Sequence, residues 1–156
     1  MRPVKKVALL HDLCGVGKAA LTNMVPVLSV MGIELVHPID LLSTHTGEYG
    51  KPAMEKISTT YIRECADHYV ANQVTFDLIF VGYLGSEGMI EAVEYFLSCF
   101  PDTEVIIDPI MGDHGRYYTN FDSSYGESMR RLLPYASIIM PNIQKGCLLT
   151  LTPDFT

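Results

Sequence analysis

The sequence has few basic residues: 11 Lys and Arg stand against 18 Asp and Glu, for a net charge of −7. Proteins that bind nucleic acid broadly, or that bind anionic membranes, need an excess of Lys and Arg. We therefore expect no nucleic acid and no membrane among the partners. A small anionic ligand stays compatible with this charge, because a local site can be positive on an acidic protein.

Closely spaced cysteines and long apolar runs are also absent. The cysteines Cys14, Cys65, Cys99 and Cys147 form no CxxC pair, which argues against a zinc knuckle or a redox motif and favours free thiols in a reducing compartment. The first apolar run ends at His11, which is too short for a signal-peptide core, and no segment is long enough to cross a bilayer. These features predict a cytoplasmic protein.

The glycine-rich segment HDLCGVGKAAL, which begins at His11, lacks the residues of a phosphate-binding loop. Gly17 and Lys18 are followed by Ala19 instead of Ser or Thr, and Asp12 stands where a P-loop needs its first glycine. The third glycine of a dinucleotide-binding fingerprint is missing as well. We expect a tight turn here, with Asp12 at the carboxyl end of the first strand, where it either contacts a ligand or caps the turn.

What the sequence does have is a regular alternation of apolar runs and helical segments. The expected strands are Val7–Leu10, Glu34–Leu42 with a bend or edge at Pro38, Asp77–Leu84, Glu104–Met111 and Ser137–Pro141. The expected helices are Gly17–Met31, Pro52–Ala71, one that opens at Ser86, and one capped by Asp122 or Ser123 that runs toward Leu133. The last three strands are almost continuously apolar, which is typical of buried parallel strands.

This alternation predicts an α/β fold with a mostly parallel central sheet and helices on both faces, in one domain over residues 1–156. The segment after the fifth strand runs from the start of a helix straight to the end of the sequence. We therefore expect a fold that stops after its fifth strand–helix unit. Its open sheet edge would favour a homodimer or other self-association.

Polar residues follow the second and third strands. The segment STHTGEYG, Ser43–Gly50, places His45 and Thr46 in a loop rich in hydroxyl groups and glycine, which suits either a ligand or an ordinary surface turn. Tyr83 follows the third strand, where its ring either lies against a flat ligand or packs in the core. Both segments are therefore candidate ligand contacts.

Two carboxylates follow the fourth strand. Asp108 sits at the end of an apolar strand, where an ionised carboxylate needs a charged partner or a cation. Asp113 follows in a turn that it could equally serve by itself. Together the two carboxylates could hold Mg²⁺, directly or through water.

Taken together, these segments resemble the pyridoxal/pyridoxamine kinases of the ribokinase-like superfamily. The resemblance is carried by HDLCGVGKAAL, LLSTHTGEYGKPA, GYLGS, DPIMGDHGRYY and LLPYASIIMPN, which occur in the family's order and spacing across nearly the whole chain. It implies a three-layer α/β/α fold and the transfer of the γ-phosphoryl group of ATP to the 5′-hydroxymethyl group of a B6 vitamer. It also implies that the sequence covers the N-terminal half of such a kinase.

Carried over to this sequence, the resemblance assigns roles to individual residues. Asp12, Thr46, Gly47 and Tyr83 would contact the vitamer; Asp108 would lie at the ATP phosphates and magnesium; and Met140 and Asn142 would lie beside the nucleotide phosphates. The catalytic base of the family is an aspartate in a glycine-rich anion hole of the C-terminal half. That half lies outside this sequence, so no catalytic residue is assigned.

One departure from the family pattern bears on activity. The family's Asn-x-x-Glu is Asn142-Ile143-Gln144-Lys145 here, so a cation replaces a glutamate that organises magnesium. Three functions therefore stay open: a kinase of B6 vitamers that is inactive as this chain alone, a vitamer-binding or vestigial fragment without turnover, and a kinase of hydroxymethylpyrimidine.

Overall fold

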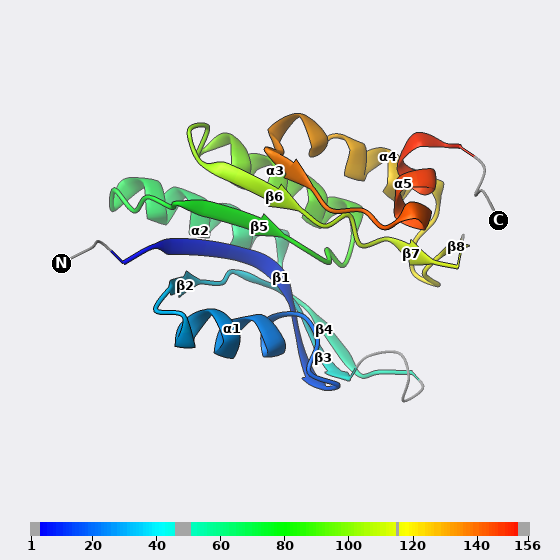
Figure 1. Cartoon of the computed structure of the whole chain (residues 1–156), viewed down its shortest axis with the longest axis horizontal. Helices are drawn as coiled ribbons and strands as arrows, with labels where there is room; N and C mark the ends of the chain where they lie inside the picture. The colour runs from blue at the N-terminus through cyan, green and yellow to red at the C-terminus, as the bar shows by residue number, and fades with distance from the viewer. Residues whose placement is uncertain (1–3, 46–50, 115, 153–156) are drawn as a thin grey trace.

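The computed structural model describes residues 4–45, 51–114 and 116–152, which form a mostly parallel sheet between helices (Figure 1). The seven-stranded sheet has the order β4-β3-β1-β5-β6-β9, and β2 also pairs with β1; only the pairing of β3 with β4 is antiparallel. The strands are β1 Lys6–Val16, β2 Glu34–Val36, β3 Ile39–His45, β4 Met54–Lys56, β5 Leu78–Val81, β6 Glu104–Ile107 and β9 Ile138–Ile139, while β7 Gly112–Asp113 and β8 Arg116–Tyr117 form a separate hairpin.

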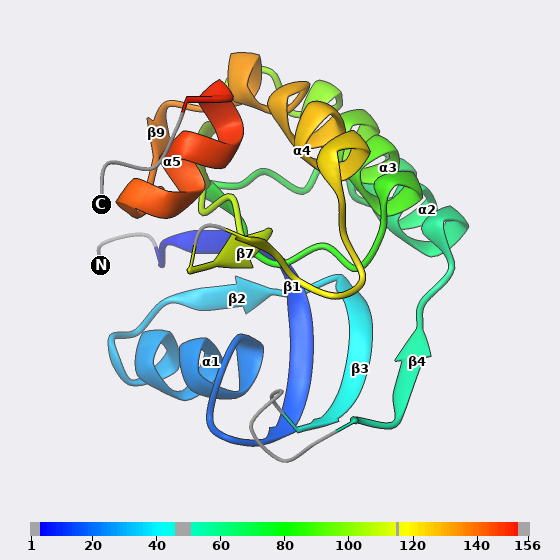
Figure 2. The ribbon, with the colours of Figure 1, turned by 90° about the vertical axis from the view of Figure 1, so that its right-hand side faces the viewer.

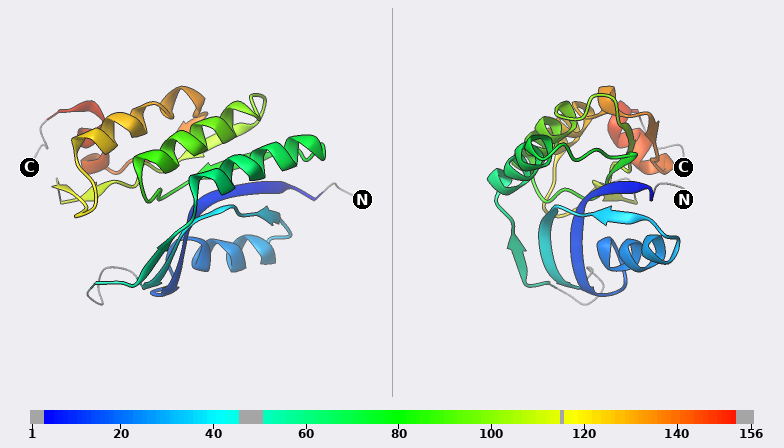
Figure 3. Two further views of the ribbon diagram at one scale, coloured as in Figure 1. Left: turned by 180° about the vertical axis from the view of Figure 1, so that it is seen from behind. Right: turned by 90° about the vertical axis from the view of Figure 1, so that its left-hand side faces the viewer.

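The helices cover both faces of the sheet, which confirms the predicted three-layer α/β/α arrangement. They are α1 Leu21–Val30, α2 Thr59–Ala71, α3 Glu87–Ser98, α4 Ser123–Arg130 and α5 Ile143–Thr150, with a 3₁₀ turn at Leu133–Tyr135. Helix α1 lies on one face, whereas α2, α3 and α4 lie side by side on the other (Figures 2 and 3). No helix among the described residues is long and apolar enough to cross a membrane.

Side chains of β1 show why both faces are covered. Ala8 and Leu10 belong to the large core cluster under α2, α3 and α4, whereas Val7 and Leu9 pack on the opposite face with Leu21 of α1. All of these residues are buried. Successive side chains of a strand point to opposite faces, so an uninterrupted apolar run produces a strand buried on both sides.

The prediction of a turn directly after Leu10 was wrong. Strand β1 continues to Val16, because its second half pairs with β3, from His11 opposite Ile39 to Val16 opposite His45. The turn comes later, at Gly17, whose φ of 108° favours glycine. Asp12 therefore lies inside a strand and not at its end.

Three further boundaries differ from the expectation. The helix expected from Gly17 begins only at Leu21. The expected strand Glu34–Leu42 is divided into β2 and β3 around Pro38, which confirms the bend expected there. The expected helix Pro52–Ala71 begins only at Thr59, and the residues before it form the edge strand β4. Ser58 caps α2 by accepting the N–H of Thr60, so the cap marks the true start of this helix.

The expected caps of α3 and α4 are confirmed. Ser86 precedes α3 and its hydroxyl accepts the N–H of Met89, while the Asp122 carboxylate precedes α4 and accepts the N–H of Ser124. Because α3 follows β5, the N-terminus of this helix lies at the carboxyl end of that strand. The caps thus fix the connection between the sheet and the helical layer near the residues that form the site.

Tyr125 joins α4 to the loop that precedes α3. Its side chain is buried, its hydroxyl donates to the carbonyl oxygen of Leu84 at 2.7 Å, and its ring stacks on Phe121 at 3.7 Å between centroids. We expect Tyr125→Phe to lower the free energy of unfolding by about 1–2 kcal/mol, because the buried carbonyl loses its donor. Urea denaturation measures this, with the more exposed Tyr61→Phe as a control; an equal loss in both variants would contradict it.

The outer edge at β9 exposes apolar side chains, as expected. Ile138, Ile139 and Met140 are all at least 39% exposed, and Ile143 at the start of α5 is more exposed still. Exposed apolar side chains beside an edge strand are a common route to association. Self-association of the chain through this edge stays a prediction.

Candidate functional site

A group of polar side chains lies where β1, β3, β5 and β6 meet at one edge of the sheet; we call Asp12, Asp40, Tyr83 and Asp108 the rim. Tyr83 follows β5, and Asp108 follows β6 directly, with its N–H donating to the carbonyl oxygen of Val81 at 2.9 Å. Burial raises the pKa of Tyr83, and the charges of Asp40 and Asp12 raise it further, so the three side chains share one electrostatic environment. Asp12 and Tyr83, both expected at the vitamer, therefore lie in one region of the sheet, and their roles there stay predictions.

Asp12 is held by its neighbour in the chain. Its carboxylate oxygen Oδ1 lies 2.7 Å from Nδ1 of His11 and accepts a hydrogen bond when that nitrogen carries the proton. In the other tautomer the same nitrogen accepts the N–H of Asp12, at 2.9 Å. The His11 ring is buried and stacks on Phe80 at 6.2 Å between centroids. His11 is thus a buried structural residue that also positions the carboxylate of Asp12.

Asp40 is a site residue that the sequence analysis missed. Its side chain is only 3% exposed; Oδ2 accepts the N–H of Gly85 at 2.9 Å, while Oδ1 has no hydrogen-bond partner among the described residues. Burial, with a contribution from the charge of Asp12, raises the pKa of Asp40 to about 7. At neutral pH this carboxyl group therefore exists in both the protonated and the ionised form. The only signal in the sequence is a single acid within the apolar segment PIDLL.

Tyr83 is fixed by residues from the segment before α4. Its hydroxyl accepts a hydrogen bond from the Asn120 side chain at 2.8 Å, and its ring packs on Phe121 at 5.5 Å between centroids. Burial raises the pKa of the hydroxyl, so Tyr83 stays neutral under ordinary conditions. A fixed aromatic ring beside carboxyl groups can lie against a flat, polar ring.

Asp108 and Asp113 reach the rim from the other side. Burial, with smaller contributions from the charges of Asp113 and Asp108, raises the pKa of Tyr118, whose ring centroid lies 6.5 Å from that of Phe121. Asp113 lies in the β7–β8 hairpin, where it is about half exposed and accepts the N–H of His114. The two acids thus belong to one region. Asp113 also stabilises its own turn, which was the alternative role expected for it.

The residues expected at the nucleotide lie at the end of β6 and beyond. Asp108 forms an ion pair with Lys145, whose Nζ lies 2.8 Å from Oδ1. The Asn142 side chain caps α5 by accepting the N–H of Lys145, and Met140 is exposed directly after β9. The structure therefore places all three expected residues near one another, with a lysine against the carboxylate that was assigned to magnesium.

Thr46 and Gly47, the other two residues expected at the vitamer, lie outside the described residues. The described residues of this segment end at His45, the last residue of β3. The roles of Thr46 and Gly47 stay predictions.

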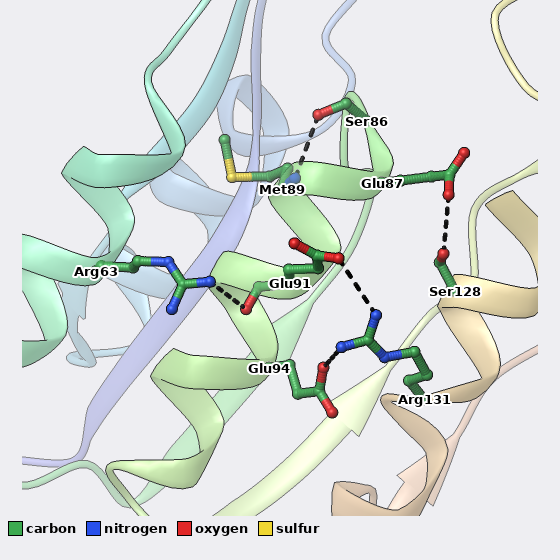
Figure 4. Close-up of polar contacts among 8 residues, drawn as sticks. All are labelled: Arg63, Ser86, Glu87, Met89, Glu91, Glu94, Ser128 and Arg131. Carbon is green, nitrogen blue, oxygen red and sulfur yellow. Dashed lines mark hydrogen bonds and ion pairs between the residues drawn. The ribbon is translucent and has the colours of Figure 1, made fainter.

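A second polar region belongs to helix packing and not to the rim. A hollow of about 430 Å³ on α2, α3 and α4 is lined by Arg63, Glu91, Glu94, Tyr95, Ser98, Arg131 and Tyr135. Its charges are satisfied internally: Arg131 bridges Glu91 and Glu94, and Arg63 donates to the carbonyl oxygen of Glu91 (Figure 4). These contacts tie the three helices together and leave the rim as the candidate site.

Comparison with known proteins agrees with this fold. The family model of phosphomethylpyrimidine kinase matches residues 28–154. The thiamine biosynthetic bifunctional enzyme TH1, chloroplastic, of Arabidopsis thaliana is 31% identical over 77 residues, which is 49% of this chain and 15% of that enzyme.

Two solved structures are similar over nearly the whole chain. One is a Bacteroides thetaiotaomicron protein described as a phosphomethylpyrimidine kinase and solved with pyridoxal: 34% identical, TM-score 0.90, covering 97% of this chain and 54% of that one. The other is pyridoxal kinase from Lactobacillus plantarum: 30% identical, TM-score 0.90, covering 97% of this chain and 55% of that one.

The chain thus spans about half the length of the solved structures that it matches. The family match extends over more than half of this chain, and it agrees with the vitamin-kinase motifs found in the sequence. The chain therefore belongs to the phosphomethylpyrimidine kinase family of the ribokinase-like superfamily.

Proposed function

We propose that the rim binds a B6 vitamer and forms the vitamer side of a kinase that transfers the γ-phosphoryl group of ATP to the 5′-hydroxymethyl group. One observation carries the proposal: Asp12 and a fixed, neutral Tyr83 lie together beside the buried Asp40. This combination suits a flat ring with polar substituents. The relatives solved with pyridoxal or named pyridoxal kinase support the same choice.

The residues would divide the work of binding. Asp12, held by His11, would accept a hydrogen bond from the ring nitrogen or a ring substituent. Tyr83 would lie against the ring face, and the protonated form of Asp40 would donate to an acceptor on the vitamer. Phosphoryl transfer depends chiefly on positioning and on compensation of phosphate charge, so these contacts would orient the hydroxymethyl group. ATP is the proposed donor; no general base is assigned among the described residues.

A pyrimidine substrate is the second candidate, because the matching family model is that of phosphomethylpyrimidine kinase. Hydroxymethylpyrimidine is also a flat ring with a hydroxymethyl group. The rim residues could contact either ring, and the two candidates differ only in which ring binds more tightly.

Calorimetric titration of the chain distinguishes these candidates. Pyridoxine and pyridoxamine are the probes, since the aldehyde of pyridoxal can react with lysines; hydroxymethylpyrimidine is the competitor. We expect the B6 vitamers to bind, and Asp12→Asn to weaken them at least about tenfold. The control is Asp102→Asn, which changes an exposed acid in the turn before β6. Tighter binding of hydroxymethylpyrimidine, or equal binding by both variants, would contradict the proposal.

A coupled assay with ATP and magnesium tests the reaction itself. We expect the chain alone to bind a vitamer without measurable turnover, because the family's base is not assigned to any residue of this sequence. Steady formation of the phosphorylated vitamer would overturn that expectation and would leave the binding proposal in place.

A further inference from the structure

Asp108 and Lys145 form a largely buried ion pair at the carboxyl end of β6. Nζ of Lys145 lies 2.8 Å from Oδ1 of Asp108, and the two side chains are 14% and 27% exposed. Both ends are fixed through the backbone. Asp108 donates its N–H to the carbonyl oxygen of Val81, and Lys145 donates its N–H to the capping side chain of Asn142. The pair is thus part of the packed structure and not a loose surface contact.

This arrangement does not fit a divalent cation on Asp108. Magnesium requires a near-octahedral shell of oxygen ligands, with one or two carboxylates among them. Here an ammonium group already contacts Oδ1, and its charge repels a second cation at the same carboxylate. Within the described ranges, no group of three or more Asp, Glu, His or Cys side chains is arranged to hold a metal ion. Asp113, the second carboxylate expected at the metal, is bonded to the N–H of His114.

We propose that Lys145 takes the place of a divalent cation on Asp108, so that this chain binds no Mg²⁺ or Mn²⁺ at the carboxyl end of β6. An ammonium group can donate three hydrogen bonds and cannot accept any, so it can serve a phosphate oxygen as well as Asp108. The tethered charge would then face the phosphates of the nucleotide, a second role that rests on the proposed kinase function.

Manganese binding tests the first role without any vitamer or nucleotide. Mn²⁺ prefers the same oxygen ligands as Mg²⁺ and can be titrated into the full chain by electron paramagnetic resonance. We expect the wild-type chain to leave Mn²⁺ free at millimolar concentration. Lys145→Glu, which turns the ammonium into a second carboxylate, should bind Mn²⁺ at least about tenfold more tightly than the wild type. The double variant Lys145→Glu/Asp108→Asn should lose this binding again.

Two further variants keep the result interpretable. Lys56→Glu makes the same charge change on the exposed edge strand β4, and it should bind no more Mn²⁺ than the wild type. Lys145→Met removes the positive charge but keeps a long apolar side chain. It therefore tests whether Asp108 can bind Mn²⁺ even if Lys145→Glu impairs folding. We expect this variant to bind Mn²⁺ more tightly than the wild type.

Two outcomes would overturn the proposal. In the first, the wild-type chain binds Mn²⁺ as tightly as Lys145→Glu and loses this binding in Asp108→Asn. In the second, neither folded Lys145 variant gains any binding. Because no vitamer is present, these outcomes leave the proposed vitamer site untouched, and failure of vitamer binding would likewise leave this result intact.

Discussion

Asp40→Asn is expected to raise the free energy of unfolding by about 3 kcal/mol at pH 8 and to leave it nearly unchanged at pH 4. The asparagine can keep the contact of Asp40, since its side-chain oxygen can accept the N–H of Gly85. The asparagine side chain is neutral at every pH, whereas the side chain of Asp40 is neutral only when it is protonated. The variant thus imitates the form of the residue that the buried site favours.

The direction follows from the pKa of Asp40, which rises from 3.8 to about 7 on folding. Between these two values the folded chain retains a proton that the unfolded chain has released. The free energy of unfolding therefore falls as the pH rises from about 4 to about 7, at up to about 1.4 kcal/mol per pH unit. Above pH 7 Asp40 is ionised in both the folded and the unfolded chain, and the folded chain bears the full free-energy cost of a buried carboxylate.

Chemical denaturation of both proteins between pH 4 and pH 8 measures the effect as the difference between the two curves. Asp102→Asn, at an exposed turn, is the control and should change the free energy by less than about 0.5 kcal/mol throughout. A constant difference between wild type and Asp40→Asn across this range would contradict the assignment of the raised pKa to Asp40.

Much of the fold was predictable because it follows from local patterns. The apolar segments around β5 and β6 indicated buried parallel strands, and Ser86 and Asp122 marked the starts of α3 and α4. Each of these features acts within a few residues of the chain. The correct fold class followed from them directly.

The wrong predictions of strand and helix boundaries arise where pairing with a distant segment decides the secondary structure. The second half of β1 is a strand only because β3 pairs with it, and the polar segment of β4 is a strand only because it pairs with β3. Neither segment has the alternation or the apolar run that would indicate a strand by itself. Tertiary contacts therefore override local preference at both places.

The site shows the same division. Tyr83 and Asp108 follow strands that the sequence indicated, so their neighbouring positions could be predicted, whereas Asp12 was expected at a strand end and lies inside β1. The pairing of Asp108 with Lys145 joins residues 37 positions apart, and the burial of Asp40 depends on the loop at Gly85. Such contacts appear only when the sheet and its connections are assembled.

Gly82→Ala should cost about 3 kcal/mol of folding free energy, a large value for adding one methyl group. A Cβ at this position would lie 2.2 Å from Cδ2 and 2.4 Å from Nε2 of His11, well inside van der Waals contact. The ring is buried and stacked on Phe80, so it can move away only by disturbing the core. Since His11 also contacts Asp12, we expect vitamer binding by the folded variant to weaken at least about tenfold.

Denaturation of three further variants identifies the cause of this loss in stability. Gly146→Ala adds the same methyl group inside α5, where nothing lies within 4 Å, and it should stabilise the chain by about 0.5–1 kcal/mol. His11→Ala removes the ring, so in the double variant His11→Ala/Gly82→Ala the second methyl group meets open space. The double variant should then be about as stable as His11→Ala alone, with a coupling energy of about 2–3 kcal/mol between the two sites. Additive losses would mean that Gly82 is needed for a reason other than its close approach to the His11 ring.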